Sequence, residues 1–235
     1  PHCCAQRRLA RFGPMLSGGS PLVVALPSGP SPLTADESKP EILKAFASNA
    51  VADFTGDILH NPKLEMIGQE GRLWLPSSGR KFDVVDLSLG DGAGLSSPGG
   101  FAISEKYAFT REAMSSYMDA LNDGGILSVT LWNKEDPPKS ILKLYATMAE
   151  AAGGTKAAQS FYIVSSYLST TTVLYKRGGL SAADIARLSA FTHSLSFDEI
   201  YYPGRHFDGS RTGKLMADYN AKKFGRPWDA RFPAQ

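Results

Sequence analysis

The stretch "FDVVDLSLGDGAG" at residues 82–94 decides the fold class, because an apolar run leads directly into a loop of acids and glycines. Residues 82–89 are mostly apolar with two valines, which is typical of a buried strand. In an open α/β sheet, ligands bind just beyond the carboxyl ends of the strands. We therefore expect "LGDGAG" to line the mouth of a pocket, with Asp91 facing it and Asp86 within or at the end of the strand.

Helical and extended patterns alternate on both sides of this stretch, which predicts a doubly wound α/β fold with a mostly parallel sheet. We expect strands at 63–67, 82–89, 126–132 and 197–203, and a strand pair at 161–177 that supplies an antiparallel edge strand. The first three should be parallel neighbours in one sheet. Expected helices cover 40–54, 70–75, 110–121, 139–152 and 181–194.

Local signals predict where several of these helices begin and end. Pro76 should end the helix at 70–75, and "NDGG" at 122–125 should separate the helix at 110–121 from the next strand. Ser181 and Asp184 have the spacing of a capping box, which predicts a helix start at that serine.

Residues 1–40 differ in composition from the rest of the chain, because they are rich in proline, glycine and serine. We expect an irregular N-terminal segment over 1–40 and a single α/β domain over 41–235. Within the segment, Ser20 and Pro21 are good starting residues for a helix, whereas "LVVAL" at 22–26 has the propensity of a strand. The sequence does not decide between the two.

Composition excludes several classes of function. The net charge of +2 and the 20% of charged residues indicate no attraction to nucleic acid or to an anionic membrane. The apolar runs are too short to span a bilayer. Cys3 and Cys4 are adjacent and indicate no disulfide framework, so we expect a cytoplasmic protein. The four histidines lack ligand spacing, which predicts no metal site.

Three acids follow three successive expected extended segments, and this pattern predicts a nucleoside site. A carboxylate matches the vicinal hydroxyls of a ribose, and Glu37 after "PLTAD" is placed for that contact. Glu70, after the strand at 63–67, is placed for the exocyclic amine of a base. Asp91 follows the strand at 82–89.

The segments "NPKLEMIGQEGRLWLPSSGRKFDVVDLSLGDGAG" (61–94) and "ISEKYAFTREAMSSYMDALNDGGILSVTLW" (103–132) resemble the spermidine synthase-like group of class I S-adenosylmethionine-dependent transferases. The resemblance covers about residues 40–135, is weaker over 160–203 and is poor before 37. It implies that Gly18 and Gly19 are the remnant of a glycine loop under the methionine part of the cofactor. It also implies that Glu37 binds the ribose and Glu70 the adenine amino group.

The chain departs from this family at two places. Aminopropyltransferases carry a D-x-x-D pair after the strand at 82–89, and here Ser88 stands at the first position and Asp91 at the second. The family also has an apolar strand and a G-x-G-x-G loop near the N-terminus, where this chain has "RLARFGPMLSGGSP" (8–21). Either the cofactor site is degenerate, or residues 1–36 reflect a shifted reading frame.

Together these features predict a transferase that binds S-adenosylmethionine or decarboxylated S-adenosylmethionine and moves a methyl or aminopropyl group to a small amine or polar acceptor. Asp91 would orient or deprotonate the acceptor, with Asp86 and Ser88 beside it, and Tyr107 would wall the acceptor pocket. A homodimer is a further expectation. Two alternatives remain: a binding domain that has lost catalysis, and a hydrolase that uses Asp86 and Asp91, or Glu70, as an acid/base pair.

Overall fold

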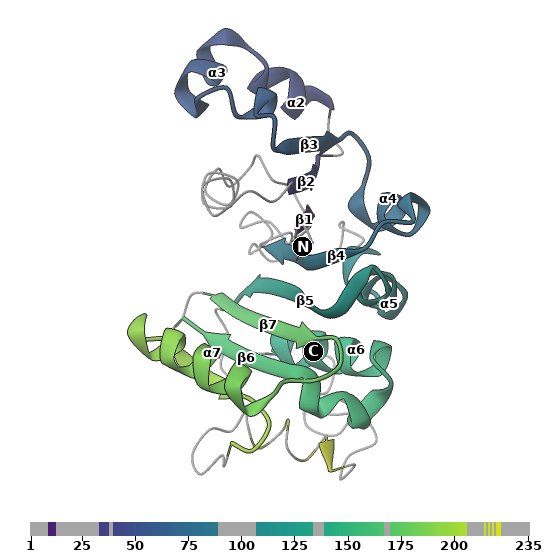
Figure 1. Cartoon of the computed structure of the whole chain (residues 1–235), viewed down its shortest axis with the longest axis vertical. Coiled ribbons are helices and arrows are strands. Elements are labelled where there is room, and N and C mark those ends of the chain that lie inside the picture. The colour runs from purple at the N-terminus through teal and green to yellow at the C-terminus, as the bar shows by residue number, and fades with distance from the viewer. Residues whose placement is uncertain are drawn as a thin grey trace, which may run out of the picture.

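The computed structural model describes residues 9–12, 33–37, 40–88, 107–133, 139–166 and 170–205, and five residues between Lys214 and Ala221. The strands form one eight-stranded sheet in the order β3-β2-β1-β4-β5-β7-β6-β8. Figure 1 shows them stacked along the long axis of the molecule. Their bounds are β1 Leu9–Phe12, β2 Leu33–Asp36, β3 Leu64–Ile67, β4 Phe82–Ser88, β5 Leu121–Trp132, β6 Phe161–Ser165, β7 Thr170–Lys176 and β8 Asp198–Tyr201.

Most of the sheet is parallel, which confirms the predicted fold class. β1 pairs in parallel with β2 and β4, β2 pairs with β3, and β4 pairs with β5. β7 runs antiparallel between β5 and β6, and β8 is the antiparallel strand at the edge. The expectation of parallel neighbours is therefore right for β4 and β5, whereas β3 lies in the same sheet but is separated from β4 by β2 and β1.

Helices cover both faces of the sheet. In Figure 1, α4, α5 and α6 lie along one side of the strands, and α2 and α3 lie at the β3 end. The bounds are α2 Pro40–Phe46, α3 Asn49–Thr55, α4 Gly71–Ser78, α5 Arg111–Asp119, α6 Lys139–Ala151 and α7 Ala182–Ser194. The 3-10 helices are η2 Ile58–His60, η5 Tyr107–Phe109 and η6 Gly154–Ser160.

The alternation of side chains along β6 places α6 and α7 on opposite faces. Phe161 packs edge-on against Tyr145 of α6, with ring centroids 5.2 Å apart. The next residue, Tyr162, points the other way, and its hydroxyl lies 3.2 Å from Thr192 Oγ1 of α7. The larger core is therefore formed between the α4–α5–α6 layer and the buried face of β4, β5 and β6.

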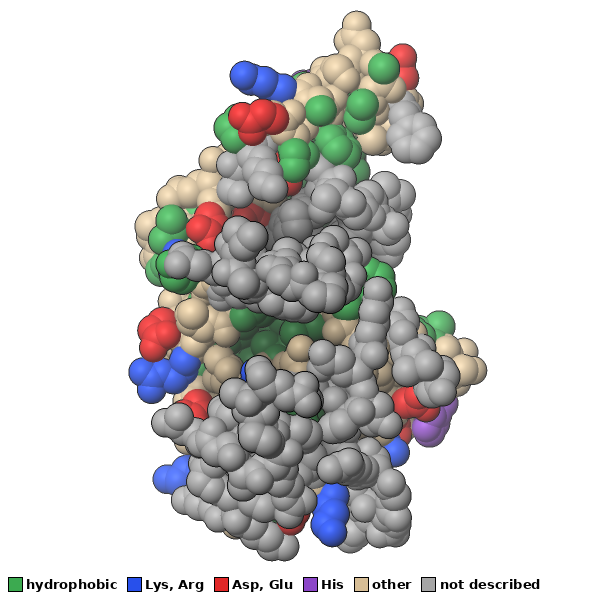
Figure 2. Space-filling view, turned by 180° about the vertical axis from the view of Figure 1, so that it is seen from behind, with side chains coloured by type: hydrophobic (Ala, Val, Ile, Leu, Met, Phe, Trp, Pro, Cys, Tyr) green, Lys and Arg blue, Asp and Glu red, His purple; other side chains and the backbone are tan. Residues whose placement is uncertain are grey.

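A second, smaller core lies at the other end of the sheet. Leu33, Ala35 and Ile58 are buried there, and partly buried side chains of α2 and β3 pack against them. Figure 2 shows hydrophobic side chains at this end of the molecule, over α2 and α3. The β2–β3 end is thus covered by two short helices.

The N-terminal expectation is wrong at two strands. β1 and β2 lie within residues 1–40, which we expected to be irregular, and β1 occupies the centre of the parallel part of the sheet. β1 is only four residues long, and its pairing with β2 and β4 supplies the stabilisation that its own sequence does not signal. Gly18, Gly19 and the "PLVVAL" segment lie outside the described residues.

Two helix expectations need correction. The expected helix at 40–54 is two helices, α2 and α3, with a break at Ala47 and Ser48. Pro76 does not end α4, which continues to Ser78 and stops at Gly79, whose φ of 63° is left-handed. Since Pro76 lacks only one N–H near the end of the helix, the last turn tolerates it.

The "NDGG" residues lie inside β5 and do not form the expected connection. α5 ends at Asp119, and β5 begins at Leu121, which pairs with Phe82. The register between β4 and β5 shifts after this pair, and Gly124 has a φ of 73° at the irregularity. A Cβ at Gly125 would lie 2.9 Å from the Asn122 carbonyl oxygen, so the glycines permit this local kink.

Candidate functional site

Two buried acids stand at the carboxyl end of β2. All four residues of this strand are buried, and Asp36 is its last residue, 6% exposed. Glu37 follows and is 2% exposed, and its backbone N–H donates to the Ile67 carbonyl at the end of β3. Because an acid in an apolar interior loses its hydration, two adjacent buried carboxylates at a strand end point to a functional role.

Asp36 holds the beginning of α4. Its Oδ2 accepts a hydrogen bond of 2.7 Å from the Gly71 amide, the first of the helix. Glu70 stands at the N-cap position, but its side chain makes no capping bond, so the carboxylate of β2 takes that role. An acid at a helix N-terminus is favourable because it meets unpaired N–H groups and the positive end of the helix dipole.

The side chain of Glu70 points instead toward Arg72. Glu70 Oε1 lies 3.5 Å from Arg72 Nε, and the Glu70 side chain is 43% exposed. The Arg72 guanidinium stacks over the ring of Tyr107 in η5, 5.2 Å from its centroid. Residues from β2, the β3–α4 junction and η5 thus meet at one place.

Tyr117 of α5 lies behind this group. Its side chain is fully buried, and burial raises the pKa of its hydroxyl above the usual range. The negative charges of Asp36 and Glu70 raise it further, whereas the positive charge of Arg72 opposes them. The Tyr117 hydroxyl therefore stays neutral, and it is close enough to Asp36, Glu70 and Arg72 for their charges to affect its pKa. We call Asp36, Glu37, Glu70, Arg72, Tyr107 and Tyr117 the acidic cluster.

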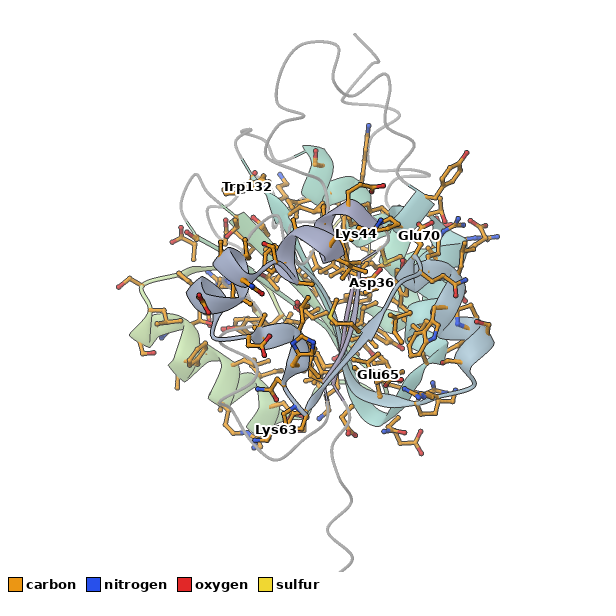
Figure 3. The ribbon with its side chains drawn as sticks, turned by 90° about the horizontal axis from the view of Figure 1, so that it is seen from above. Asp36, Lys44, Lys63, Glu65, Glu70 and Trp132 are labelled. Atoms are coloured by element: carbon orange, nitrogen blue, oxygen red, sulfur yellow. The ribbon has the colours of Figure 1, made fainter. Side chains whose placement is uncertain are left out.

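Figure 3 shows where the acidic cluster lies in the sheet. Asp36 and Glu70 are close together near the edge at which β5 ends in Trp132, and Lys63, just before β3, lies toward the opposite edge. This carboxyl edge is where ligands bind in open α/β sheets. Carboxylate acceptors suit the hydroxyls of a ribose and the amino group of an adenine, so this set of acceptors fits an adenine nucleoside.

The other predicted site residues are only partly described. Asp86 lies within β4, as expected, two residues before the strand ends at Ser88. Ser88 pairs with Thr130 of β5 at the carboxyl edge. Asp91 and the rest of "LGDGAG" lie outside the described residues, so their place at a pocket mouth stays a prediction, as does the hydrolase alternative.

Sequence reasoning missed three members of the acidic cluster. Asp36, Arg72 and Tyr117 were not among the expected site residues. The signal for Asp36 was its position at the end of "PLTAD", but the expectation went to Glu37, one residue later. Tyr107, expected at the acceptor pocket, contacts Arg72 of the acidic cluster.

Within the described ranges, no group of three or more His, Cys, Asp or Glu side chains could hold a metal ion. No helix in the described part of the chain is both long and apolar enough to cross a membrane.

Comparisons with known proteins identify the fold. No protein-family model and no curated protein sequence matches the chain. A spermidine synthase solved with the transition-state analogue AdoDATO matches at a TM-score of 0.53 and 13% identity, over 76% of this chain and 56% of that one. A probable spermidine synthase from Corynebacterium glutamicum matches at 0.56 and 15% identity, over 87% and 74%.

A methyltransferase matches over a similar span. Human methyltransferase-like protein 13, solved with S-adenosylhomocysteine, gives a TM-score of 0.53 at 15% identity, over 89% of this chain and 88% of that one. The chain therefore has the class I fold shared by spermidine synthases and S-adenosylmethionine-dependent methyltransferases. It spans little more than half the length of the spermidine synthase solved with AdoDATO.

Proposed function

We propose that this chain binds S-adenosylmethionine or its decarboxylated form and transfers a methyl or aminopropyl group to a small acceptor. The observation that carries the proposal is the pair of buried acids at the end of β2, with Asp36 bound to the first amide of α4. It is supported by the class I fold, in which the matched proteins include one with S-adenosylhomocysteine and one with AdoDATO. We further propose that the protein is cytoplasmic.

Each acid has a distinct role in this proposal. Glu37 would accept hydrogen bonds from the ribose hydroxyls, and Asp36 would fix α4 so that its N-terminal end meets the base. Glu70, held beside Arg72, would accept from the adenine amino group. Tyr117 would remain uncharged and would pack behind these acids.

The bound cofactor would supply an electrophilic carbon whose bond to the sulfonium breaks as the acceptor's lone pair forms the new bond. The protein's contribution is mainly positioning and exclusion of water. Asp91 would take the proton that the acceptor loses, since a carboxylate can act as a general base. Gly18 and Gly19 would lie under the methionine part of the cofactor.

Calorimetric titration of the full chain tests the proposal. S-adenosylmethionine, its decarboxylated form and S-adenosylhomocysteine should be titrated separately, with adenosine 5′-monophosphate as a control nucleotide. We expect binding of at least one sulfonium or thioether nucleoside, and weaker binding of the control. If none of the three ligands gives a heat of binding at concentrations about tenfold above the micromolar range, the proposal is contradicted.

A second function is favoured by one residue. Ser88 ends β4 where aminopropyltransferases carry the first acid of their pair, and a serine is a poor acceptor for an ammonium proton. The chain would then bind the nucleoside without transferring aminopropyl groups. Nucleoside binding with no turnover of a labelled methyl or aminopropyl donor, across a panel of small amines and acids, would favour this alternative.

A further inference from the structure

A pocket of about 210 Å³, partly open to solvent and called the cavity below, lies beside the carboxyl end of β5. This volume is well above the roughly 10–15 Å³ that one water molecule needs, so the cavity has room for a small fragment. It is smaller than the pockets that enclose drug-sized ligands. Its lining comes from η5, β5 and α6: Phe109, Leu131, Ser140, Lys143, Leu144 and Thr147.

The spacing of residues on α6 explains how the cavity forms. Ser140, Lys143, Leu144 and Thr147 follow the i, i+3, i+4, i+7 pattern, so they share one face of the helix. Leu131 is buried, as are Val129 and Leu127 at alternate positions of β5. The cavity is therefore apolar where Phe109, Leu131 and Leu144 line it, and polar along Ser140, Lys143 and Thr147.

Among the described residues that line this cavity, the net charge is positive. Lys143 is exposed, lines the cavity and forms no ion pair with another described residue. None of the described residues that line it is acidic. A cationic guest such as a protonated diamine would be repelled by Lys143, whereas an anionic group would be attracted.

One short element joins this cavity to the acidic cluster. Tyr107 and Phe109 are two residues apart in η5. Tyr107 stacks under the Arg72 guanidinium of the acidic cluster, and Phe109 lines the cavity. η5 therefore supplies one side chain to the acidic cluster and one to the lining of the cavity.

We propose that this cavity binds part of the acceptor, and that the acceptor is a small molecule with an apolar body and a carboxylate. The apolar body would contact Phe109, Leu131 and Leu144, and Lys143 would bind the carboxylate. The acceptor role rests on the transferase function proposed above. A fully cationic polyamine is disfavoured as the guest of this cavity, because it would place an ammonium group beside Lys143.

Matched probes of one length and different charge test the assignment. Hexanoate, hexylamine and 1-hexanol should each be titrated into the full chain, with binding followed by ligand-observed NMR. We expect hexanoate to bind more tightly than hexanol, and hexylamine to bind most weakly. Hexylamine binding as tight as that of hexanoate, or an absence of hexanoate binding, overturns the proposal.

Charge-reversal variants locate the binding. Lys143→Glu should weaken hexanoate binding at least about fivefold and strengthen hexylamine binding, because an attraction becomes a repulsion. Lys156→Glu, an exposed lysine in η6, makes the same change of charge away from the cavity and should leave both probes unchanged. Equal effects of the two variants would show a general charge effect and overturn the assignment to Lys143.

A space-filling variant tests the apolar part. Thr147→Phe should abolish hexanoate binding by filling the cavity, with circular dichroism to verify folding. If this variant does not fold, Lys143→Glu still decides, because that side chain is exposed.

If S-adenosylhomocysteine binds but hexanoate is not preferred over the other probes, only the proposal for this cavity is contradicted. Hexanoate binding without nucleoside binding defeats the proposed transferase and removes the acceptor role from the cavity.

Discussion

The two edges of the sheet use their charged residues differently. At the amino edge, where β5 begins, Arg177 donates to the carbonyls of Met118 and Leu121, each at 3.1 Å. Near it, Asp184 at the start of α7 accepts from Lys176 Nζ at 2.5 Å. At the carboxyl edge, Asp36 and Glu37 are buried at the end of β2.

The two edges thus distinguish charged side chains that stabilise the fold from charged side chains that are placed to bind a ligand. Arg177 and Asp184 satisfy the ends of helices and strands, which is an ordinary structural use of charge. The acids at the end of β2 are buried where an α/β sheet binds ligands. Variants at the carboxyl edge should therefore change ligand binding, with a loss of stability as well at Asp36, which caps α4, whereas variants at the amino edge should change stability alone.

The largest effect on ligand binding is expected at Asp36. Asp36→Ala removes the bond to the Gly71 amide and leaves that buried N–H without its acceptor. The unfolding free energy should fall by about 1.5–3 kcal/mol, the range for a hydrogen bond to a charged group, and affinity for S-adenosylhomocysteine should fall as well because α4 loses the contact that fixes its N-terminal end. Calorimetry measures this, with Asp36→Asn as the control that keeps an acceptor oxygen. Unchanged affinity in the alanine variant would remove Asp36 from the proposed site.

Glu37 should give a similar or slightly smaller effect. Glu37→Ala should weaken nucleoside binding by roughly 1–3 kcal/mol, because a ribose would lose a charged acceptor. Glu37→Gln keeps the shape and part of the acceptor capacity, and should fall between wild type and alanine. If Glu37→Ala loses stability but no affinity, the acid serves the fold, and the contrast between the two edges fails there.

The carboxyl edge also shows how far the sequence could predict the site. Glu37 was expected because it follows "PLTAD", and Glu70 because it follows the expected strand at 63–67; the structure places Glu37 directly after β2 and Glu70 three residues after β3. Asp36 was missed because β2 is a four-residue strand, "LTAD", with only one large apolar side chain. Its burial comes from pairing with β1 and β3, which no local pattern encodes.

The same distinction explains the fold predictions. The capping box of Ser181 and Asp184 was predicted and is present, because both partners lie within one helical turn. β4 and the end of β5 were predicted from their β-branched and apolar runs. The position of β1 at the centre of the sheet was missed, since "LARF" carries little strand signal and depends on long-range pairing.

A pH-dependent effect is expected at the amino edge. Hydrogen bonds from Lys176 and Ser181 hold the pKa of Asp184 well below its usual range. Because this pKa is lower in the folded chain, the stabilisation is present above the unfolded value of about 4 and is lost as the pH falls toward the folded value. Asp184→Asn should therefore cost about 1–2 kcal/mol of unfolding free energy at pH 7.

Thermal or denaturant unfolding at several pH values checks this. The difference in stability between wild type and Asp184→Asn should shrink as the pH falls below about 4. Affinity for S-adenosylhomocysteine at pH 7 should not change, because α7 begins at the amino edge. A loss of nucleoside affinity in this variant would break the proposed division between the edges.

The smallest effect on ligand affinity is expected at Glu70, which both pairs with Arg72 and is the proposed acceptor for the adenine amino group. Its carboxylate is 43% exposed and lies 3.5 Å from Arg72 Nε, so water and the guanidinium already compensate its charge. Removing an exposed ion pair costs less than about 1 kcal/mol, and a partly hydrated acceptor contributes little more to a ligand. Glu70→Gln should lower affinity for S-adenosylhomocysteine by less than about fivefold.

The choice of nucleobase separates a contact with adenine from a general charge effect. If Glu70 accepts from the adenine amino group, Glu70→Gln should reduce the preference for the adenine nucleoside over its inosine analogue, which lacks that amine. Arg72→Gln serves as the matched control, since it breaks the same ion pair and leaves the carboxylate in place. An unchanged preference in Glu70→Gln would assign Glu70 to the Arg72–Tyr107 contact alone, and leave Asp36 and Glu37 as the ligand-binding acids of this edge.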